Sequence, residues 1–234
     1  MDADFELVHY KKINEYEVFL IDDYKFRNHS IEMEEFGAFA THLDFEIIPV
    51  NNIWISKYIQ EKERDLFIEN ALKQLDMSMY GVDRMNAYET ALVLEKNLRM
   101  KINGSTKNTL EEVYSSVYHE FRWQGIKIYL VDGNVVRNLY KTDFVEGGHG
   151  YVYSWIPKGE IWVEMDLHPD EIPLMILHEM VERTLMKEKD EQYAYAHKVA
   201  GKVEFSFRPD KFKKQDVESL NSKKIYELVE QFNS

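Results

Sequence analysis

The stretch IPVNNIW at residues 48–54 returns 108 residues later as IPKGEIW at 156–162. Neighbouring matches follow in the same or nearly the same register: Phe36 with Phe144, Leu20-Ile21-Asp22 with Leu130-Val131-Asp132, and Arg27-Asn28 with Arg137-Asn138. Two α+β halves that merely share common strand patterns would explain scattered matches. Paired motifs in register with their flanks favour an internal duplication, and the long period indicates two lobes rather than a solenoid.

The predicted elements come in the same order in both halves. In the second half, residues 126–131 are predicted as a strand that ends in a turn at 132–134, and 151–166 as a β-hairpin. Two helical patterns follow, at about 170–187 and 191–205. The first half has the corresponding strand at 17–23, the hairpin at 45–56, and helical patterns at about 61–76 and 84–100.

The sequence therefore predicts an α+β fold with two pseudo-repeated lobes, each a strand plus a β-hairpin followed by two helices. We place the N-terminal lobe at 1–105 and the C-terminal lobe at 106–210. A C-terminal helix is expected within 211–234, with its apolar pattern over 216–233. The polar segment 101–108 (KINGSTKN) is the expected join.

The composition is that of an ordinary globular protein, with 234 residues, 44% hydrophobic and 30% charged. We expect a soluble, cytoplasmic protein, because the apolar runs are too short for a membrane span and the N-terminus is too polar for a signal peptide. The chain has no cysteine, which excludes disulfides, thiolate ligands and cysteine nucleophiles. Its net charge of −13 argues against nucleic acid as a partner, since phosphate backbones would be repelled.

A candidate metal site lies in the second half, at His178-Glu179-Met180-Val181-Glu182. On the helix predicted from about 170, His178 belongs to the apolar stripe that faces a core. Glu182 lies about 40° from His178 round the helix, whereas Glu179 is about 100° away. This is the HExxH metal pattern with its last histidine replaced by glutamate. We therefore assign His178 and Glu182 to a divalent metal and Glu179 to general-base work.

The next helix supplies the third expected ligand, His197, because the turn near 187–190 folds that helix back onto the first. Glu204 lies on nearly the same face and is expected to be a fourth ligand or an acceptor that orients an imidazole. His149, in the glycine-dense run 147–150, would complete the coordination sphere or stabilise an oxyanion; a plain turn is the alternative. A hydrogen-bonded core histidine, or a structural or pH-sensing cluster, would show the same residues.

The N-terminal half differs at the matching positions. In the register of the hairpins, Asn70, Ala71 and Gln74 stand where His178, Glu179 and Glu182 stand. Aligning Tyr88 with Tyr193 puts Leu92 opposite His197 and Arg99 opposite Glu204. The sequence thus predicts one metal site per chain and a degenerate N-terminal lobe that serves as a scaffold.

The segments IPKGEIWVE, LHEMVERTLM and YAHKVAGKVE, within about residues 144–206, resemble a group of uncharacterised phage and bacterial proteins. These share an HExxER motif followed by AHxxAxxxE, and they look like relatives of zincin-type metallopeptidases. The residues that carry the motif here are His178, Glu179, Glu182, His197 and Glu204. The resemblance implies a metal-dependent, metallopeptidase-like site in a phage-type protein.

The expected function is a metal-dependent hydrolase of amide or peptide bonds, with zinc as the metal and manganese or iron as alternatives. Its substrate would be a small molecule or a peptide, and the chain a monomer or a homodimer. A binding or inhibitory protein is the alternative from another class; its acidic surface would engage a protein partner and its His/Glu cluster would be structural. A redox iron or manganese site is a third option, but the second Glu-x-x-His of a di-iron bundle is missing.

Overall fold

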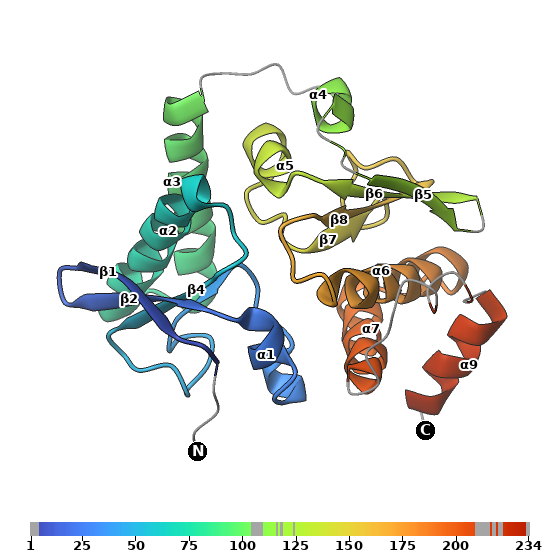
Figure 1. Cartoon of the computed structure of the whole chain (residues 1–234), viewed down its shortest axis with the longest axis horizontal. Coiled ribbons are helices and arrows are strands. Elements are labelled where there is room, and N and C mark those ends of the chain that lie inside the picture. The colour runs from blue at the N-terminus through green and yellow to red at the C-terminus, as the bar shows by residue number, and fades with distance from the viewer. Residues whose placement is uncertain are drawn as a thin grey trace. The chain divides into compact units, whose positions relative to one another are not determined.

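The computed structural model describes residues 5–103, 110–115, 117, 119–123, 125–208, 216, 219 and 222–232. It confirms the α+β class: two small sheets are each followed by helices, and a helix lies at the C-terminal end (Figure 1). The chain forms two compact units, which we call unit 1 (Met1–Glu112 with Asn134–Val145) and unit 2 (Val113–Gly133 with Glu146–Ser234). The segment Asn134–Val145 therefore belongs to the second repeat by sequence but to unit 1 by packing.

The sheet of unit 1 has the strand order β1-β2-β4-β3. Its strands are β1 (Val8–Ile13), β2 (Tyr16–Ile21), β3 (Phe39–Ala40) and β4 (Asn52–Ser56). The central strands β2 and β4 pair in parallel, and the outer strands pair antiparallel to them. Both faces of a parallel pair are normally covered, and Ile53, Trp54 and Ile55 of β4 are accordingly almost completely buried.

The sheet of unit 2 has the same order, β5-β6-β8-β7. Its strands are β5 (His119–Trp123), β6 (Ile126–Val131), β7 (Gly147–His149) and β8 (Glu160–Glu164). The parallel register is also the same, because Glu17 faces Asn52 in one sheet and Lys127 faces Glu160 in the other. The shared topology and register confirm the two pseudo-repeated lobes.

The prediction of the first strand of each hairpin is wrong. Residues 45–49 and 151–157 form turns, and the strands that pair with β4 and β8 are the short β3 and β7. In unit 2 the amides of Val152 and Tyr153 both donate to the carbonyl oxygen of His149, which holds the chain in a turn. The apolar residues of these segments fill the core instead of lining a strand, as the burial of Ile48 and Ile156 shows.

Short elements that the sequence pattern does not reveal precede or connect the central strands. They are α1 (Asp23–Arg27), η1 (Ile31–Met33), α4 (Leu110–Ser115) and α5 (Gly133–Leu139), together with the edge strands β1 and β5. The turn expected at 132–134 is thus the beginning of a helix. At the matching place in unit 1, the side chain of Asp22 accepts a hydrogen bond from the amide of Lys25 and caps α1.

The long helices lie where the helical pattern predicts them: α2 (Glu61–Met79), α3 (Arg84–Asn103), α6 (Glu171–Glu188) and α7 (Tyr193–Phe207). Helix α2 packs on α3, and α6 packs on α7 (Figure 1). Every residue of α6 from Pro173 to Leu185 is buried. A helix that is buried all round carries its polar side chains into the interior, so those of α6 need partners there.

The predicted C-terminal helix is present as α9 (Ser222–Phe232), and parts of its expected range lie outside the described residues. It contacts α6 and α7. Ile225 and Val229 are buried, so this amphipathic helix covers the helix pair of unit 2.

Candidate metal centre

Unit 2 brings together the six residues that the sequence singles out. Helix α6 carries His178, Glu179 and Glu182, helix α7 carries His197 and Glu204, and strand β7 ends with His149. Five of the six are buried. The side chain of His197 is 33% exposed, so the cluster reaches the surface on the α7 side.

Three ligand atoms form a compact triangle. His197 Nδ1 lies 2.9 Å from Glu182 Oε2 and 3.0 Å from His178 Nε2, and the third side, from His178 Nε2 to Glu182 Oε2, is 3.6 Å. A tetrahedral ion with bonds of about 2.0–2.1 Å has ligand atoms about 3.3–3.4 Å apart. The three atoms therefore match one face of a metal coordination sphere, and the His/Glu groups are close enough to hold a metal ion.

A second layer of buried groups orients His178. Its Nδ1 lies 2.9 Å from Glu204 Oε2, and the other oxygen of Glu204 pairs with Arg208. Arg208 also donates to both oxygens of Glu171, at 2.9 and 2.7 Å. A carboxylate that accepts from Nδ1 places the proton there and leaves the Nε2 lone pair for a metal, as in carboxylate–histidine–zinc triads. Glu204 thus has the position of the orienting acceptor and not of a ligand in the triangle.

His149 contacts the second oxygen of Glu182. Its Nε2 lies 3.1 Å from Glu182 Oε1, an ion-pair distance without the alignment of a good hydrogen bond. The amide of Tyr151 donates to His149 Nδ1 at 3.2 Å, which favours the tautomer with its proton on Nε2. Burial lowers the pKa of His149, which favours the neutral form of this ring. His149 therefore holds Glu182 Oε1 in place, while Glu182 Oε2 faces the two other histidines.

Glu179 is buried beside the triangle with one oxygen unused. Its Oε2 has no hydrogen-bond partner among the described residues. Burial, and then the charge of Glu182, raise the pKa of Glu179 to about 8. Close to it, a Cβ added to Gly147 would come within 3.1 Å of Glu179 Oε1, so the glycine leaves room for this carboxyl group. Glu179, His149 and Glu182 form a second set of groups within the reach of one ion.

The connected network is strongly acidic. The carboxylates of Glu171 and Glu204 pair with the guanidinium group of Arg208, and the carboxylate of Glu182 faces the imidazoles of His178 and His197. Burial opposes a charge on His178, but Glu182 and Glu204 outweigh it and raise its pKa well above the ordinary value. Burial also opposes the charge on Glu182, yet its three histidine neighbours hold its pKa below normal. Such a cluster requires cations, which are either protons on the imidazoles or a metal.

Unit 1 contains the counterpart of this network. Asn70 Nδ2 donates to Glu95 Oε2 at 2.6 Å, as His178 pairs with Glu204. Arg99 binds Glu95 and Glu63, as Arg208 binds Glu204 and Glu171. These pairings equate α3 with α7 at a shift of 109 residues, so Tyr88 corresponds to His197 and Glu95 to Glu204. The sequence alignment of Leu92 with His197 and of Arg99 with Glu204 is therefore wrong by one helical turn.

The structure adds three residues to the site: Arg208 and Glu171 behind Glu204, and Gly147 beside Glu179. The spacing of Glu204 and Arg208, four apart on one helix, is the sequence signal that could have revealed the first of them. Comparison of the chain with protein-family models, curated proteins and solved structures gives no match. The family resemblance of the motif therefore stays a prediction. Within the described part of the chain, none of the helices combines the length and apolar character of a membrane span.

Proposed function

We propose that unit 2 is a metal-dependent hydrolase in which His178, Glu182 and His197 hold one divalent cation. The triangle of ligand atoms, with an oriented imidazole on one side and an unpartnered buried carboxyl group on the other, carries the proposal. Two imidazole nitrogens and one carboxylate oxygen at this spacing suit zinc best. Manganese and iron accept the same donors and are the alternatives.

The residues around the triangle have separate tasks in this proposal. A divalent cation there would supply Lewis acidity and make hydroxide accessible near neutral pH. A divalent cation in the triangle would favour the ionised form of Glu179, which could then accept the proton of the attacking water, since its Oε2 has no other partner among the described residues. Glu204 orients His178, and His149 holds the far oxygen of Glu182.

Amide or peptide bonds are the proposed substrate class. The support is the motif itself, because in the HExxH pattern the glutamate after the first ligand is the general base of metallopeptidases. Here Glu179 follows His178 in the same way, and Glu182 takes the place of the second histidine.

Metal analysis tests the centre directly. We expect purified protein to carry about one equivalent of metal, and the variants His178→Ala and Glu182→Gln to lose most of it. Glu95→Gln, at the position in unit 1 that corresponds to Glu204, is the matched control and should keep the metal. Equal and negligible metal in the wild type and in all three variants would refute the centre.

Glu179→Gln separates the hydrolase from the alternative, a binding or inhibitory protein with an acidic surface and a structural cluster. The hydrolase predicts that this variant keeps its metal but loses cleavage of a mixed peptide library. Biological activity that survives in Glu179→Gln with the metal still bound would favour the binding protein.

A further inference from the structure

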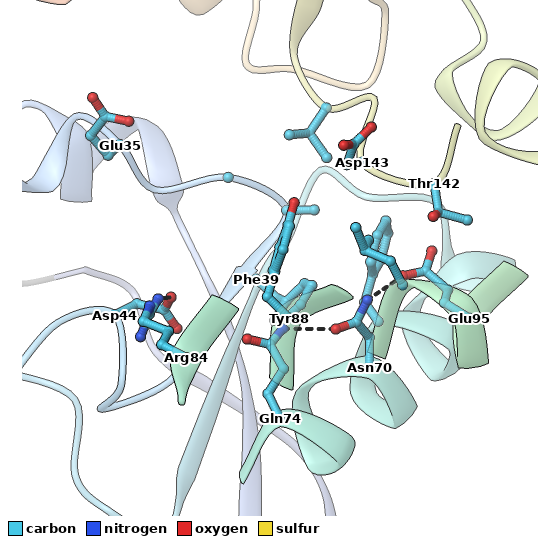
Figure 2. Close-up of a pocket in the computed structure, with 15 residues that line it drawn as sticks. Glu35, Phe39, Asp44, Asn70, Gln74, Arg84, Tyr88, Glu95, Thr142 and Asp143 are labelled. Carbon is cyan, nitrogen blue, oxygen red and sulfur yellow. Dashed lines mark hydrogen bonds and ion pairs between the residues drawn. The ribbon is translucent and has the colours of Figure 1, made fainter. Parts of the chain in front are cut away.

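Unit 1 contains a cavity of about 210 Å³ at the place that corresponds to the metal centre (Figure 2). It is lined by Asn70, Gln74, Tyr88 and Glu95, the counterparts of His178, Glu182, His197 and Glu204. The segment 142–145 of the same unit adds Thr142, Asp143 and Val145 to the lining. The first repeat therefore has a partly open pocket here, and its walls differ in chemistry from the matching residues of the second repeat.

Several polar groups of the lining have unused hydrogen-bonding capacity. Gln74 is 7% exposed and donates from Nε2 to Asn70 Oδ1 at 2.8 Å, which leaves its carbonyl oxygen without a partner in the described chain (Figure 2). Thr142, 6% exposed, and Tyr88 have hydroxyl groups that bond to no described residue. Asp143 Oδ1 is buried and also unpartnered among the described residues, while its Oδ2 pairs with Lys141 at 2.6 Å. All four groups can accept a hydrogen bond from a ligand.

The charged groups of the lining argue against an anionic ligand. Arg84 is the one basic residue that lines the cavity among the described residues, and it is paired with Asp44 and with the carbonyl oxygen of Leu43. It is therefore not free to bind an anion. Both oxygens of Glu95 are occupied, by Asn70 and Arg99, and the described lining contains no histidine, so a transition metal such as zinc lacks the nitrogen ligands that it prefers.

Aromatic and aliphatic side chains complete the walls. Phe39 and Phe67 lie with ring centroids 5.7 Å apart, and Leu92 and Val145 also line the space. Aromatic faces attract organic cations as well as burying apolar groups. The lining thus combines hydrogen-bond acceptors with a surface for an apolar stem.

We propose that this cavity binds a primary ammonium group carried on a short apolar stem. The ammonium group donates to Asp143 Oδ1, the carbonyl oxygen of Gln74 and the hydroxyl of Tyr88 or Thr142, and the stem packs on Phe39. A primary ammonium has three donors and no acceptor, which matches a lining rich in acceptors. This site is separate from the metal centre and does not depend on the proposed hydrolase activity.

The wall that carries Asp143 is fixed in place. Arg137 of α5, which precedes the segment 142–145, donates to both oxygens of the buried Glu63, at 2.9 and 2.6 Å. It also donates to the carbonyl oxygen of Phe144 at 2.9 Å. Lys96 of α3 lies 3.0–3.4 Å from three carbonyl oxygens at the end of α5. The acceptors are therefore held in position before a ligand arrives, which lowers the entropy cost of binding.

Titration of the full chain with three probes of one shape tests the proposal: benzylamine, which is protonated at neutral pH, benzyl alcohol and benzoate. We expect one saturable benzylammonium site with a dissociation constant on the order of 1 mM. The alcohol and the benzoate should bind at least about tenfold more weakly. Asp143→Asn, which keeps the shape of the side chain, should weaken the binding of benzylammonium by about ten- to hundredfold. The binding of benzyl alcohol should stay unchanged. Chemical shifts of labelled protein locate the site.

Glu182→Gln in unit 2 is the control that separates the two sites, and it should leave benzylammonium binding unchanged. Loss of binding in Glu182→Gln, with retention in Asp143→Asn, would assign the amine to the His/Glu cluster and overturn the proposal. Equal binding of the three probes, or no saturable binding of benzylamine, would overturn it as well.

Discussion

Replacing Glu204 by glutamine tests whether the carboxylate that contacts His178 contributes to the metal affinity of the candidate centre. Glu204 joins two buried groups, because one oxygen lies 2.9 Å from His178 Nδ1 and the other pairs with Arg208. An amide has one acceptor and one donor end. It can keep both contacts only if its amino group donates to His178 Nδ1, which moves the imidazole proton to Nε2, where the metal would bind. The substitution also removes one negative charge from the network.

The expected loss of metal affinity is about 10- to 100-fold, the usual effect of removing a partner that orients a metal-binding histidine. This corresponds to about 1.4–2.7 kcal/mol of binding free energy. The loss of folding stability should be about 1–3 kcal/mol, since Arg208 keeps its two contacts with Glu171. A domain with a typical stability of about 5–15 kcal/mol remains folded after such a change.

The assay is a competition titration against a chromophoric chelator at fixed pH, with thermal unfolding recorded for each protein. Glu95→Gln is the matched control, because Glu95 joins Asn70 and Arg99 in unit 1 as Glu204 joins His178 and Arg208 in unit 2. Both variants should lose stability, but only Glu204→Gln should lose metal affinity. Wild-type affinity in Glu204→Gln, or an equal loss in Glu95→Gln, would refute the reasoning.

Three further variants have defined outcomes. Glu63→Gln leaves two buried arginines without their shared carboxylate and should reduce the free energy of unfolding by about 3–5 kcal/mol in urea titrations. Burial opposes the charge of Glu63, but the two arginines outweigh it and lower its pKa. Its contribution is therefore present above the unfolded pKa of about 4.3 and should fade as the pH falls further, so wild type and variant should converge in acid. Gly147→Ala should displace Glu179 and reduce turnover while the metal stays bound, as parallel activity and metal measurements would show. Gly150→Ala should lower the melting temperature strongly, because its Cβ would clash with the carbonyl oxygen of Ile156. Nothing lies within 4 Å of a Cβ at Gly159, so Gly159→Ala should leave the melting temperature unchanged.

The features that could be predicted from the sequence are those with a local signature. The long helices have an apolar periodicity, and His178 and Glu182 are brought together by one helical turn. The meeting of these residues with His197 required only that α7 fold back on α6, which the short turn between them ensures.

The strand β7 had no such signature. Its sequence Gly147-Gly148-His149 has low strand propensity, whereas the turn at 151–157 has an aromatic residue at 151, 153 and 155, a period of two that is typical of a strand. The reason for the glycine at 147 is tertiary: an added Cβ would come within 3.2 Å of the Trp162 carbonyl oxygen as well as meeting Glu179. Only the packed structure shows which of the two segments can lie beside β8.

The alignment of α3 with α7 could not be found from the apolar pattern for a related reason. A slip of four residues rotates a helix by only about 40°, so its apolar face hardly changes. The buried ion pairs fix the register instead, since Glu95 with Arg99 and Glu204 with Arg208 can be matched in only one way. Patterns of charge at spacing four were therefore more informative for this helix than the match between Tyr88 and Tyr193.

The two networks differ most clearly at one pair of matching positions. In unit 1 the carboxylates of Glu63 and Glu95 pair with the guanidinium groups of Arg99 and Arg137. In unit 2 Arg208 pairs with Glu171 and Glu204, and Glu182 faces the imidazoles of His178 and His197. Gln74 stands in unit 1 where Glu182 stands in unit 2, so a neutral amide replaces the carboxylate that faces the two imidazoles. A divalent cation is therefore expected at Glu182, because a buried carboxylate needs a cationic partner and a buried amide does not.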